Sequence, residues 1–315
     1  MRTFESKPAV RERVPLLVGL VGPSGSGKTY SALRLAKGFG GKTFVIDTEA
    51  RRALWYADTF AFEHIDFRPP FGPLDYLAAI NHAVSQGADN VVIDSMSHEH
   101  QGQGGVLEMH ESEAVRLAAA WHTSLDKVKM AAWQRPKAER TQLVQAMLQA
   151  KVNFILCFRA KEKMDLRDSK NPKVLGWMPI AGEEYVYEMT VNCLLYPNGG
   201  GVPQWQPDEM GEKAIIKLPA HFRELFAGKG PLDERIGKGL AEWAAGKKAP
   251  PAVEYATKEQ ADEIVLEMKR LKFDRATAKE WLAQYGATKV TDIPLDRAIP
   301  ALQELMKRKG PDDES

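Results

Sequence analysis

Residues 22–30 have the sequence GPSGSGKTY, and they directly follow the apolar run LLVGLV at residues 16–21. Glycine, lysine and threonine occupy every fixed position of the pattern G-x-x-x-x-G-K-[ST]. In this pattern the glycines let backbone N–H groups converge on phosphate oxygens, the lysine adds positive charge, and the hydroxyl binds Mg²⁺. The apolar run predicts a strand, and residues 29–38 predict a helix, which is the context that the motif requires. The sequence therefore predicts a nucleotide phosphate site made of Gly22, Pro23, Ser24, Gly25, Ser26, Gly27, Lys28, Thr29 and Tyr30.

Apolar runs of strand length alternate with helical patterns along the first two hundred residues. Strands that are rich in Val, Ile, Leu and Phe and separated by helices indicate a parallel sheet covered on both faces. We therefore predict an α/β fold, with a mainly parallel sheet flanked by helices. Beyond the loop and its neighbours, the predicted strands lie at 43–46, 90–93, 152–158, 191–196 and 214–218, and the predicted helices at 73–85, 108–149 with a break near Arg135, and 232–245.

The chain divides into a large and a small predicted domain. Residues 1–245 form the α/β domain, and the Lys-, Pro- and Ala-rich segment GKKAPPAVEYA at 246–256 predicts a linker. Residues 257–310 begin with TKEQ, a capping box that opens the first of three predicted helices. We expect a small helical domain there, followed by a disordered tail at 311–315.

Composition excludes a global attraction to nucleic acids, because 43 basic residues face 42 acidic ones. Residues 127–173 nevertheless carry twelve Lys and Arg against four Asp and Glu, which predicts a local basic region. Cys157 and Cys193 lie in apolar runs and are expected to be buried thiols rather than a disulfide. No stretch suggests a signal peptide or a membrane span, so we expect a cytoplasmic protein.

Acidic side chains follow two of the predicted strands. Asp94 ends the strand NVVID and, with Thr29, is the expected pair of Mg²⁺ ligands. Ser95 stands where many ATPases have a glutamate, so the residue that activates water has to come from elsewhere. Glu49, after the strand FVID, is our candidate; the alternatives are that Glu49 only pairs with Arg51 or Arg52, or that Glu99 is the base.

The order of these motifs resembles the core of RecA-like recombinases. GPSGSGKT, FVIDTE, VVIDS, FILCFRAKEKM and GEEYVYEMTVNCLLYP follow one another over residues 16–218. The chain is most similar to the short, phage-encoded RecA-like ATPases associated with single-strand annealing. The resemblance implies a RecA-like P-loop NTPase core, ATP and Mg²⁺ as cofactors, and Glu49 and Lys28 as catalytic residues. It also implies a γ-phosphate sensor at Arg159, where the family usually has glutamine.

In RecA-like filaments, two loops line the DNA, and their counterparts here are residues 98–105 and 164–179. The second loop overlaps the basic region, which favours contacts with phosphates and stacking on bases. The alternative is that these charges lie on a solvated helix face. Trp121 and Trp133 occupy apolar helical positions and are expected in the core. The candidate residues for DNA binding are Lys161, Lys163, Arg167, Lys170, Lys173 and Trp177.

The sequence thus favours an ATP-hydrolysing RecA-like protein that acts on single-stranded DNA in phage recombination, annealing or repair. We expect a homo-oligomer in the host cytoplasm, with Lys213 or Lys217 of a neighbouring subunit contacting the γ-phosphate and a single-strand-binding protein as a candidate partner. Two alternatives stay open: a nucleotide-controlled adaptor that binds a protein, and a P-loop kinase with RDSKNPK as its lid. His98, His100 and His110 do not match a known zinc-ligand spacing.

Overall fold

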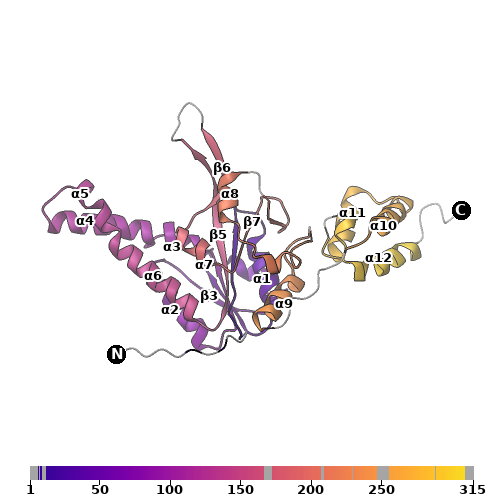
Figure 1. The fold of residues 1–315 in the computed structure, drawn as a ribbon, viewed down its shortest axis with the longest axis horizontal. Coiled ribbons are helices and arrows are strands. Elements are labelled where there is room, and N and C mark those ends of the chain that lie inside the picture. Colours follow the sequence, from indigo (N-terminus) through magenta and orange to yellow (C-terminus); the bar gives the residue numbers. More distant parts are fainter. Residues whose placement is uncertain are drawn as a thin grey trace.

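The computed structural model describes residues 6, 8, 12–166, 172–206, 209–228, 230–246, 255–287 and 289–308 (Figure 1). A single twisted sheet forms the centre, with the strand order β3-β2-β4-β5-β1-β7-β8, and β6 pairs with β5. Strands β3, β2, β4, β5, β1 and β7 run parallel, whereas β6 and β8 pair antiparallel. The strands are β1 (Leu17–Gly22), β2 (Thr43–Asp47), β3 (Glu63–Asp66), β4 (Asn90–Asp94), β5 (Asn153–Asp165), β6 (Lys173–Pro179), β7 (Val191–Leu195) and β8 (Pro203–Gln204).

Helices cover both faces of the sheet, as the continuous apolar strands predicted. Neighbouring residues of one strand enter opposite cores: Leu17 and Val21 face one side, and Val18 and Leu20 the other. Helices α2, α6 and α7 pack on the first face, and α1 and α9 on the second. The helices before the C-terminal part are α1 (Lys28–Phe39), α2 (Pro73–Ser85), α3 (Ser97–Gln101), α4 (Val106–Ala120), α5 (Leu125–Ala132), α6 (Gln134–Gln149), α7 (Glu183–Glu188), α8 (Met210–Ile215) and α9 (Glu234–Ala244).

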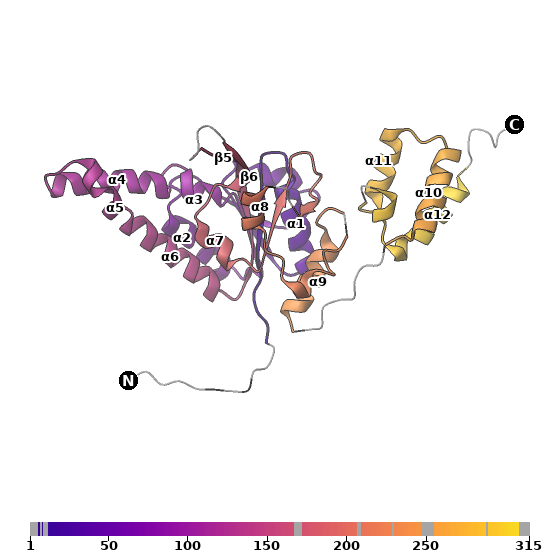
Figure 2. The ribbon, with the colours of Figure 1, turned by 45° about the horizontal axis from the view of Figure 1, so that its top comes forward.

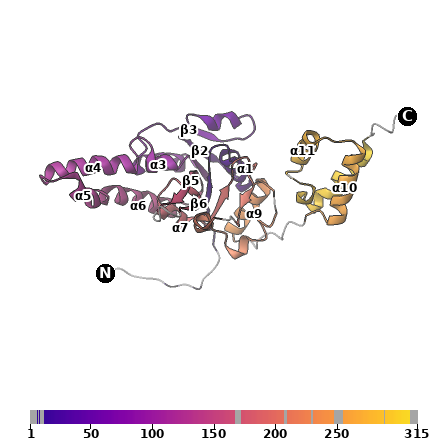
Figure 3. The same ribbon diagram turned by 90° about the horizontal axis from the view of Figure 1, so that it is seen from above.

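The segment predicted as one broken helix at 108–149 is instead an arm of two helices followed by α6. The chain turns between α4 and α5, where His122 has a φ of 50°. Ala114, Leu117, Val128 and Ala132 form a small core between the two helices. Figure 3 shows the arm extending away from the sheet. Trp121, predicted in the core, is 57% exposed because it follows the end of α4 at the tip of the arm.

Two other predictions were wrong. Residues 164–179, expected as a loop, lie mostly in a hairpin, because β5 continues to Asp165 and pairs with β6 (Figure 1). Residues 214–218, expected as a strand, do not form one: Ala214 and Ile215 end α8, and Lys217 forms an isolated bridge with Asn192. Glu212 of α8 is buried, and its carboxylate accepts hydrogen bonds from the Trp177 N–H and the Tyr196 hydroxyl.

The C-terminal helices are α10 (Lys258–Arg270), α11 (Arg275–Gln284) and α12 (Leu295–Lys307), shown in Figure 2. The predicted capping box is present, with reciprocal hydrogen bonds between Thr257 and Gln260. The three helices enclose their own core, which includes Ile264 and Trp281. Of the predicted linker, residues 247–254 lie outside the described residues, as does the predicted tail at 311–315. Every helix in the described ranges is too short or too polar to cross a membrane.

Helices α1 and α9 approach so closely that two glycines are required. A Cβ atom at Gly38 would overlap the carbonyl oxygen of Glu234, and one at Gly237 would overlap the carbonyl oxygen of Leu35. Arg34 of α1 also pairs with the Glu234 carboxylate at 2.7 Å. These contacts hold α1, which begins at the phosphate loop, against α9, the last helix of the α/β domain.

We expect Gly38→Ala to lower the free energy of unfolding by about 1–3 kcal/mol, because the added methyl group has to push α9 away. Urea denaturation measures the effect. Lys37→Ala, at the exposed neighbouring position, is the control and should change stability little. Equal stability of the two variants would show that the helices do not depend on this close contact.

Candidate functional site

The loop between β1 and α1 has the backbone that the motif predicts. Gly25 and Gly27 have φ values of 76° and 87°, which favour glycine over every residue with a Cβ atom. The Lys28 ammonium donates hydrogen bonds to the carbonyl oxygens of Gly22 and Pro23, both at 2.8 Å. Burial lowers the pKa of Lys28, although the nearby carboxylates of Asp94 and Glu49 oppose the shift. The loop therefore holds a desolvated cation close to its converging N–H groups.

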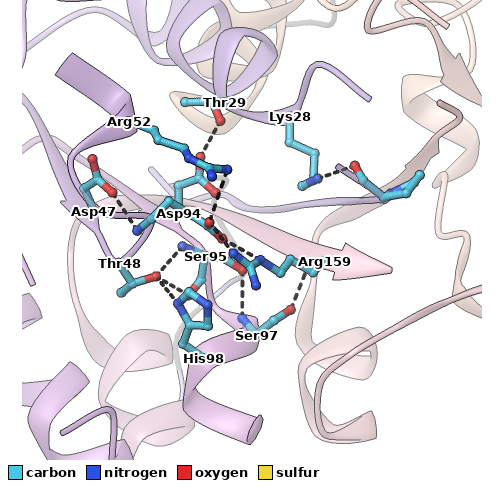
Figure 4. A network of polar contacts seen from close by, with 12 residues as sticks. Lys28, Thr29, Asp47, Thr48, Arg52, Asp94, Ser95, Ser97, His98 and Arg159 are labelled. Carbon is cyan, nitrogen blue, oxygen red and sulfur yellow. Dashed lines mark hydrogen bonds and ion pairs between the residues drawn. The ribbon is translucent and has the colours of Figure 1, made fainter. Parts of the chain in front are cut away.

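Thr29 and Asp94, the predicted Mg²⁺ ligands, lie side by side. The Thr29 hydroxyl donates to Asp94 Oδ2 at 2.5 Å (Figure 4). Burial raises the pKa of Asp94 from 3.8 to about 6, because the hydrogen bond from Thr29 and the charge of Lys28 offset only part of the desolvation. One carboxylate and one hydroxyl match the few protein oxygens that bind Mg²⁺ when phosphates supply further ligands. The pair therefore fits a magnesium ion that arrives with a nucleotide.

Glu49 and Arg159, predicted as base and sensor, form an ion pair with each other. Arg159 Nε donates to Glu49 Oε1 at 2.6 Å, and its Nη2 donates to Oε2. Glu49 follows β2 and Arg159 lies within β5, and these two strands flank β4, so the two side chains meet across the end of β4. Arg52 Nη1 lies 4.0 Å from the same carboxylate. The pair of Glu49 with Arg52, an alternative in the sequence analysis, is thus present, but Arg159 also holds Glu49.

Asp47, the last residue of β2, is a functional residue that the sequence analysis did not identify. Its fully buried carboxylate accepts hydrogen bonds from the N–H groups of Glu49 at 2.7 Å and Ala53 at 2.9 Å. His64 Nε2 lies 3.1 Å from the same carboxylate. These contacts fold residues 48–53 into a tight turn, so Asp47 fixes the backbone that carries Glu49.

A second network joins the turns after β2 and β4 to Arg159 of β5 (Figure 4). The Ser95 N–H donates to Thr48 Oγ1 at 2.7 Å, and His98 Nδ1 lies 2.7 Å from the same oxygen. The Arg159 N–H donates to Ser97 Oγ at 2.8 Å. The backbones beside Glu49, Asp94 and Arg159 are therefore tied together, although these residues lie far apart in the sequence.

Glu99, the reserve candidate for the base, is committed elsewhere. Its carboxylate has no exposed surface and accepts two hydrogen bonds from Arg140 of α6, both at 2.9 Å. Burial raises the pKa of Glu99, and Arg140 limits the shift. His100 Nδ1 lies 3.0 Å from the same guanidinium. Glu99 therefore holds α3 against α6, and we assign it no catalytic role.

The predicted basic region does not form one surface. Arg140 is buried, Arg159 pairs with Glu49, and Arg135 pairs with Glu139. Lys161, Lys163 and Lys173 are exposed on the hairpin of β5 and β6, whereas Trp177 is half-buried against the core. Arg167 and Lys170 lie outside the described residues. Lys213 is exposed, and Lys217 Nζ donates to the carbonyl oxygen of Tyr187.

A cavity of about 650 Å³ opens over the phosphate loop at the carboxyl ends of the strands. It is large enough for a small-molecule ligand. The predicted phosphate, metal and catalytic residues thus meet in one place. The charged and hydroxyl side chains in its wall are Ser24, Lys28, Thr29, Tyr30, Glu49, Arg52, Tyr56, Asp94 and Arg159.

Asp94→Asn should stabilise the ligand-free protein at pH 8 by up to about 3 kcal/mol, because a pKa raised by about two units opposes folding once the carboxyl ionises. The unfolded chain releases this proton near pH 3.8 and the folded chain only near 6, so the wild type loses stability as the pH rises through this window. At pH 4.5 the two proteins should therefore differ little. Urea denaturation at both pH values checks this, with exposed Asp58→Asn as the control. A variant that is less stable than the wild type at pH 8 would contradict the prediction.

Comparison with protein families gives one match. The family model described as an AAA domain matches residues 15–193, which include the phosphate loop and all strands from β1 to β6. Among curated proteins, none is similar enough to the chain to count as a match. The AAA match agrees with a P-loop NTPase fold and indicates a nucleotide-binding ATPase. With more than half of its length in the matched segment, the chain belongs to the AAA domain family.

Proposed function

We propose that this protein is a Mg²⁺-dependent ATPase whose hydrolysis is coupled to single-stranded DNA in recombination, annealing or repair. The observation that carries the proposal is the ion pair of Glu49 and Arg159 over the phosphate loop. An acid that can activate water and a cation that can sense a phosphate hold each other in one cavity. The arrangement fits a site in which ATP binding changes what both side chains contact.

ATP hydrolysis uses these residues in distinct ways. The loop N–H groups and Lys28 bind the β- and γ-phosphates. Mg²⁺, when bound by Thr29 and Asp94, neutralises charge on the phosphates. Water attacks the γ-phosphorus, the bond to the bridging oxygen breaks, and ADP leaves with that electron pair. Glu49 orients the water and accepts its proton, so the products are ADP and inorganic phosphate.

In the state described here Arg159 occupies both oxygens of Glu49, so the acid is not available to water. A γ-phosphate carries more negative charge than one carboxylate and competes for the guanidinium. We therefore propose that ATP draws Arg159 away and releases Glu49. Arg159 lies on β5, and its carbonyl oxygen accepts a hydrogen bond at 2.8 Å from the N–H of Ile180, just after β6. A shift of Arg159 therefore moves the base of the hairpin formed by β5 and β6.

The hairpin is our candidate for the DNA contact. Lys161, Lys163 and Lys173 are exposed on it and offer charge to phosphates. Met164 and Leu166 are 48% and 66% exposed near its end and offer apolar surface to bases. The proposal extends to a homo-oligomer on the DNA strand, a single-strand-binding protein as partner and the host cytoplasm as location. It retains the phage origin that the sequence resemblance implied.

Two other functions make different predictions. A nucleotide-controlled adaptor would bind a protein through α10–α12, and removal of residues 256–315 would abolish that binding while leaving DNA-stimulated hydrolysis intact. A P-loop kinase would transfer phosphate to a nucleoside or nucleotide. RDSKNPK, its proposed lid, spans residues 167–173, of which 167–171 lie outside the described residues. We favour the ATPase over the kinase because Glu49 lies beside the phosphate loop, where it can activate water. Hydrolysis needs no second substrate to accept the phosphate.

Glu49→Gln should preserve ATP affinity and lower kcat by about 10²–10⁴-fold, because the amide cannot accept the proton of water. Lys28→Ala should instead weaken ATP binding itself, since it removes the cation of the loop. Equilibrium binding of a fluorescent ATP analogue and phosphate release measure the two quantities separately. Wild-type turnover in the glutamine variant would exclude Glu49 as the base.

Single-stranded DNA should raise the ATPase rate of the wild type at low salt, and Lys163→Glu should reduce both DNA affinity and this stimulation. A lost phosphate contact lowers the slope of log affinity against log salt by about one unit. Lys151→Glu is the matched control, because Lys151 is exposed just before the opposite end of β5. No stimulation by DNA in the wild type, or equal effects of the two substitutions, would contradict the proposed DNA contact.

A further inference from the structure

Arg52 lies in the same cavity as the proposed catalytic residues but has no role so far. Its Nη1 is 4.0 Å from Glu49 Oε2, and its side chain is 58% exposed. Arg52 and Arg159 both approach Oε2 of Glu49. The wall of the cavity also contains Lys28. Arg52 thus adds a second arginine to the cavity over the phosphate loop.

The backbone next to Arg52 is held by a buried hydrogen bond, whereas the Arg52 side chain is largely exposed. The residue begins a 3₁₀ turn, η1 (Arg52–Tyr56), directly after Arg51, which has a φ of 67°. Ala53 is 1% exposed, and its N–H donates to the buried carboxylate of Asp47 at 2.9 Å. The same carboxylate holds the Glu49 N–H. Asp47 therefore fixes Arg52 and Glu49 as one unit, and the long arginine side chain spans the remaining distance.

The charges of the cavity favour Arg52 as a phosphate ligand. Lys28, Arg52 and Arg159 face Glu49 and Asp94 there, three cations against two carboxylates. Arg159 holds Glu49 through two short hydrogen bonds, whereas the contact of Arg52 with Glu49 is long. Arg52 therefore has the least to give up when an anion arrives, and a bidentate bond to phosphate is stronger than its present contact.

We infer that Arg52 is a further catalytic residue, which contacts the γ-phosphate of ATP bound in its own chain and stabilises the charge of the transition state. The inference rests on the proposed function. It places this cation in the same chain, whereas the sequence analysis expected it from Lys213 or Lys217 of a neighbouring subunit.

Arg52→Ala should lower kcat by about 10²-fold or more while ATP affinity changes less than threefold, because an arginine at the transferring phosphate acts mainly in the transition state. Arg52→Lys should recover part of the rate. Arg51→Asn is the matched control, since Arg51 is exposed and its charge acts on Asp66 outside the cavity, and asparagine tolerates the left-handed backbone. Wild-type turnover of Arg52→Ala would overturn the inference.

Mixing two inactive variants tests whether Arg52 acts within its own chain. A Lys28→Ala subunit keeps Arg52, so it would restore hydrolysis by an Arg52→Ala neighbour if the arginine reached across an interface. We expect no activity above the sum of the separate variants. Recovery in the mixture would overturn the assignment to the same chain.

Binding of ADP with aluminium fluoride and Mg²⁺ tests the contact without turnover. Arg52→Ala should weaken this transition-state mimic at least tenfold and leave ADP affinity unchanged, whereas Arg51→Asn should alter neither. Equal affinity of the wild type and Arg52→Ala for the mimic would overturn the inference. A wild type that binds the mimic but never hydrolyses ATP would instead contradict the proposed function, so the two failures are distinguishable.

Discussion

Parallel pairing of β1, β5, β4 and β2 is the constraint on which the site depends. The register aligns Gly22 with Arg159, and Asp94 with both Asp47 and Cys157, so β1, β2 and β4 end within two residues of one level while β5 continues to Asp165. Residues from segments more than a hundred positions apart are thereby brought to the same edge. No single turn creates the cavity; it lies where β1, β2 and β4 end beside β5, on a sheet whose two faces are both packed.

The cavity is dense in charge, and burial determines how each charge is held. The Lys28 ammonium donates hydrogen bonds to carbonyl oxygens of its own loop, and the Asp94 carboxylate accepts a hydrogen bond from the Thr29 hydroxyl. Glu49 is 11% exposed and engages a cation, as does fully buried Glu99 farther from the loop. A carboxylate with little access to water needs such partners. The partner differs in each case, and Arg159, the partner of Glu49, also lines the cavity over the phosphate loop.

The parts of the site that the sequence predicted are those that local pattern determines. The loop around Lys28 is contiguous, and Asp94 and Glu49 follow apolar strands directly, so their positions at the sheet edge follow from the parallel fold. The pairing of Glu49 with Arg159 was not predicted, because it depends on which strand lies between β2 and β5. The buried bond of Glu99 to Arg140 likewise joins two helices whose packing no local pattern specifies. The hairpin was not predicted because its lysines and glutamate hide the alternating pattern of a strand. The end of α8 was predicted as a strand because AIIKL has the apolar composition of a strand.

The arm of α4 and α5 is held by far less apolar contact than the rest of the domain. Its core contains two alanines, one leucine and one valine, whereas each face of the sheet buries a large continuous cluster. A segment with so few buried contacts opens at a lower free energy than the global unfolding of the protein. Backbone amides of α4 and α5 will therefore exchange with solvent deuterium well before those of β1 and β4. The arm behaves as a separate cooperative unit, able to melt and reform while the strands beneath the phosphate loop stay intact.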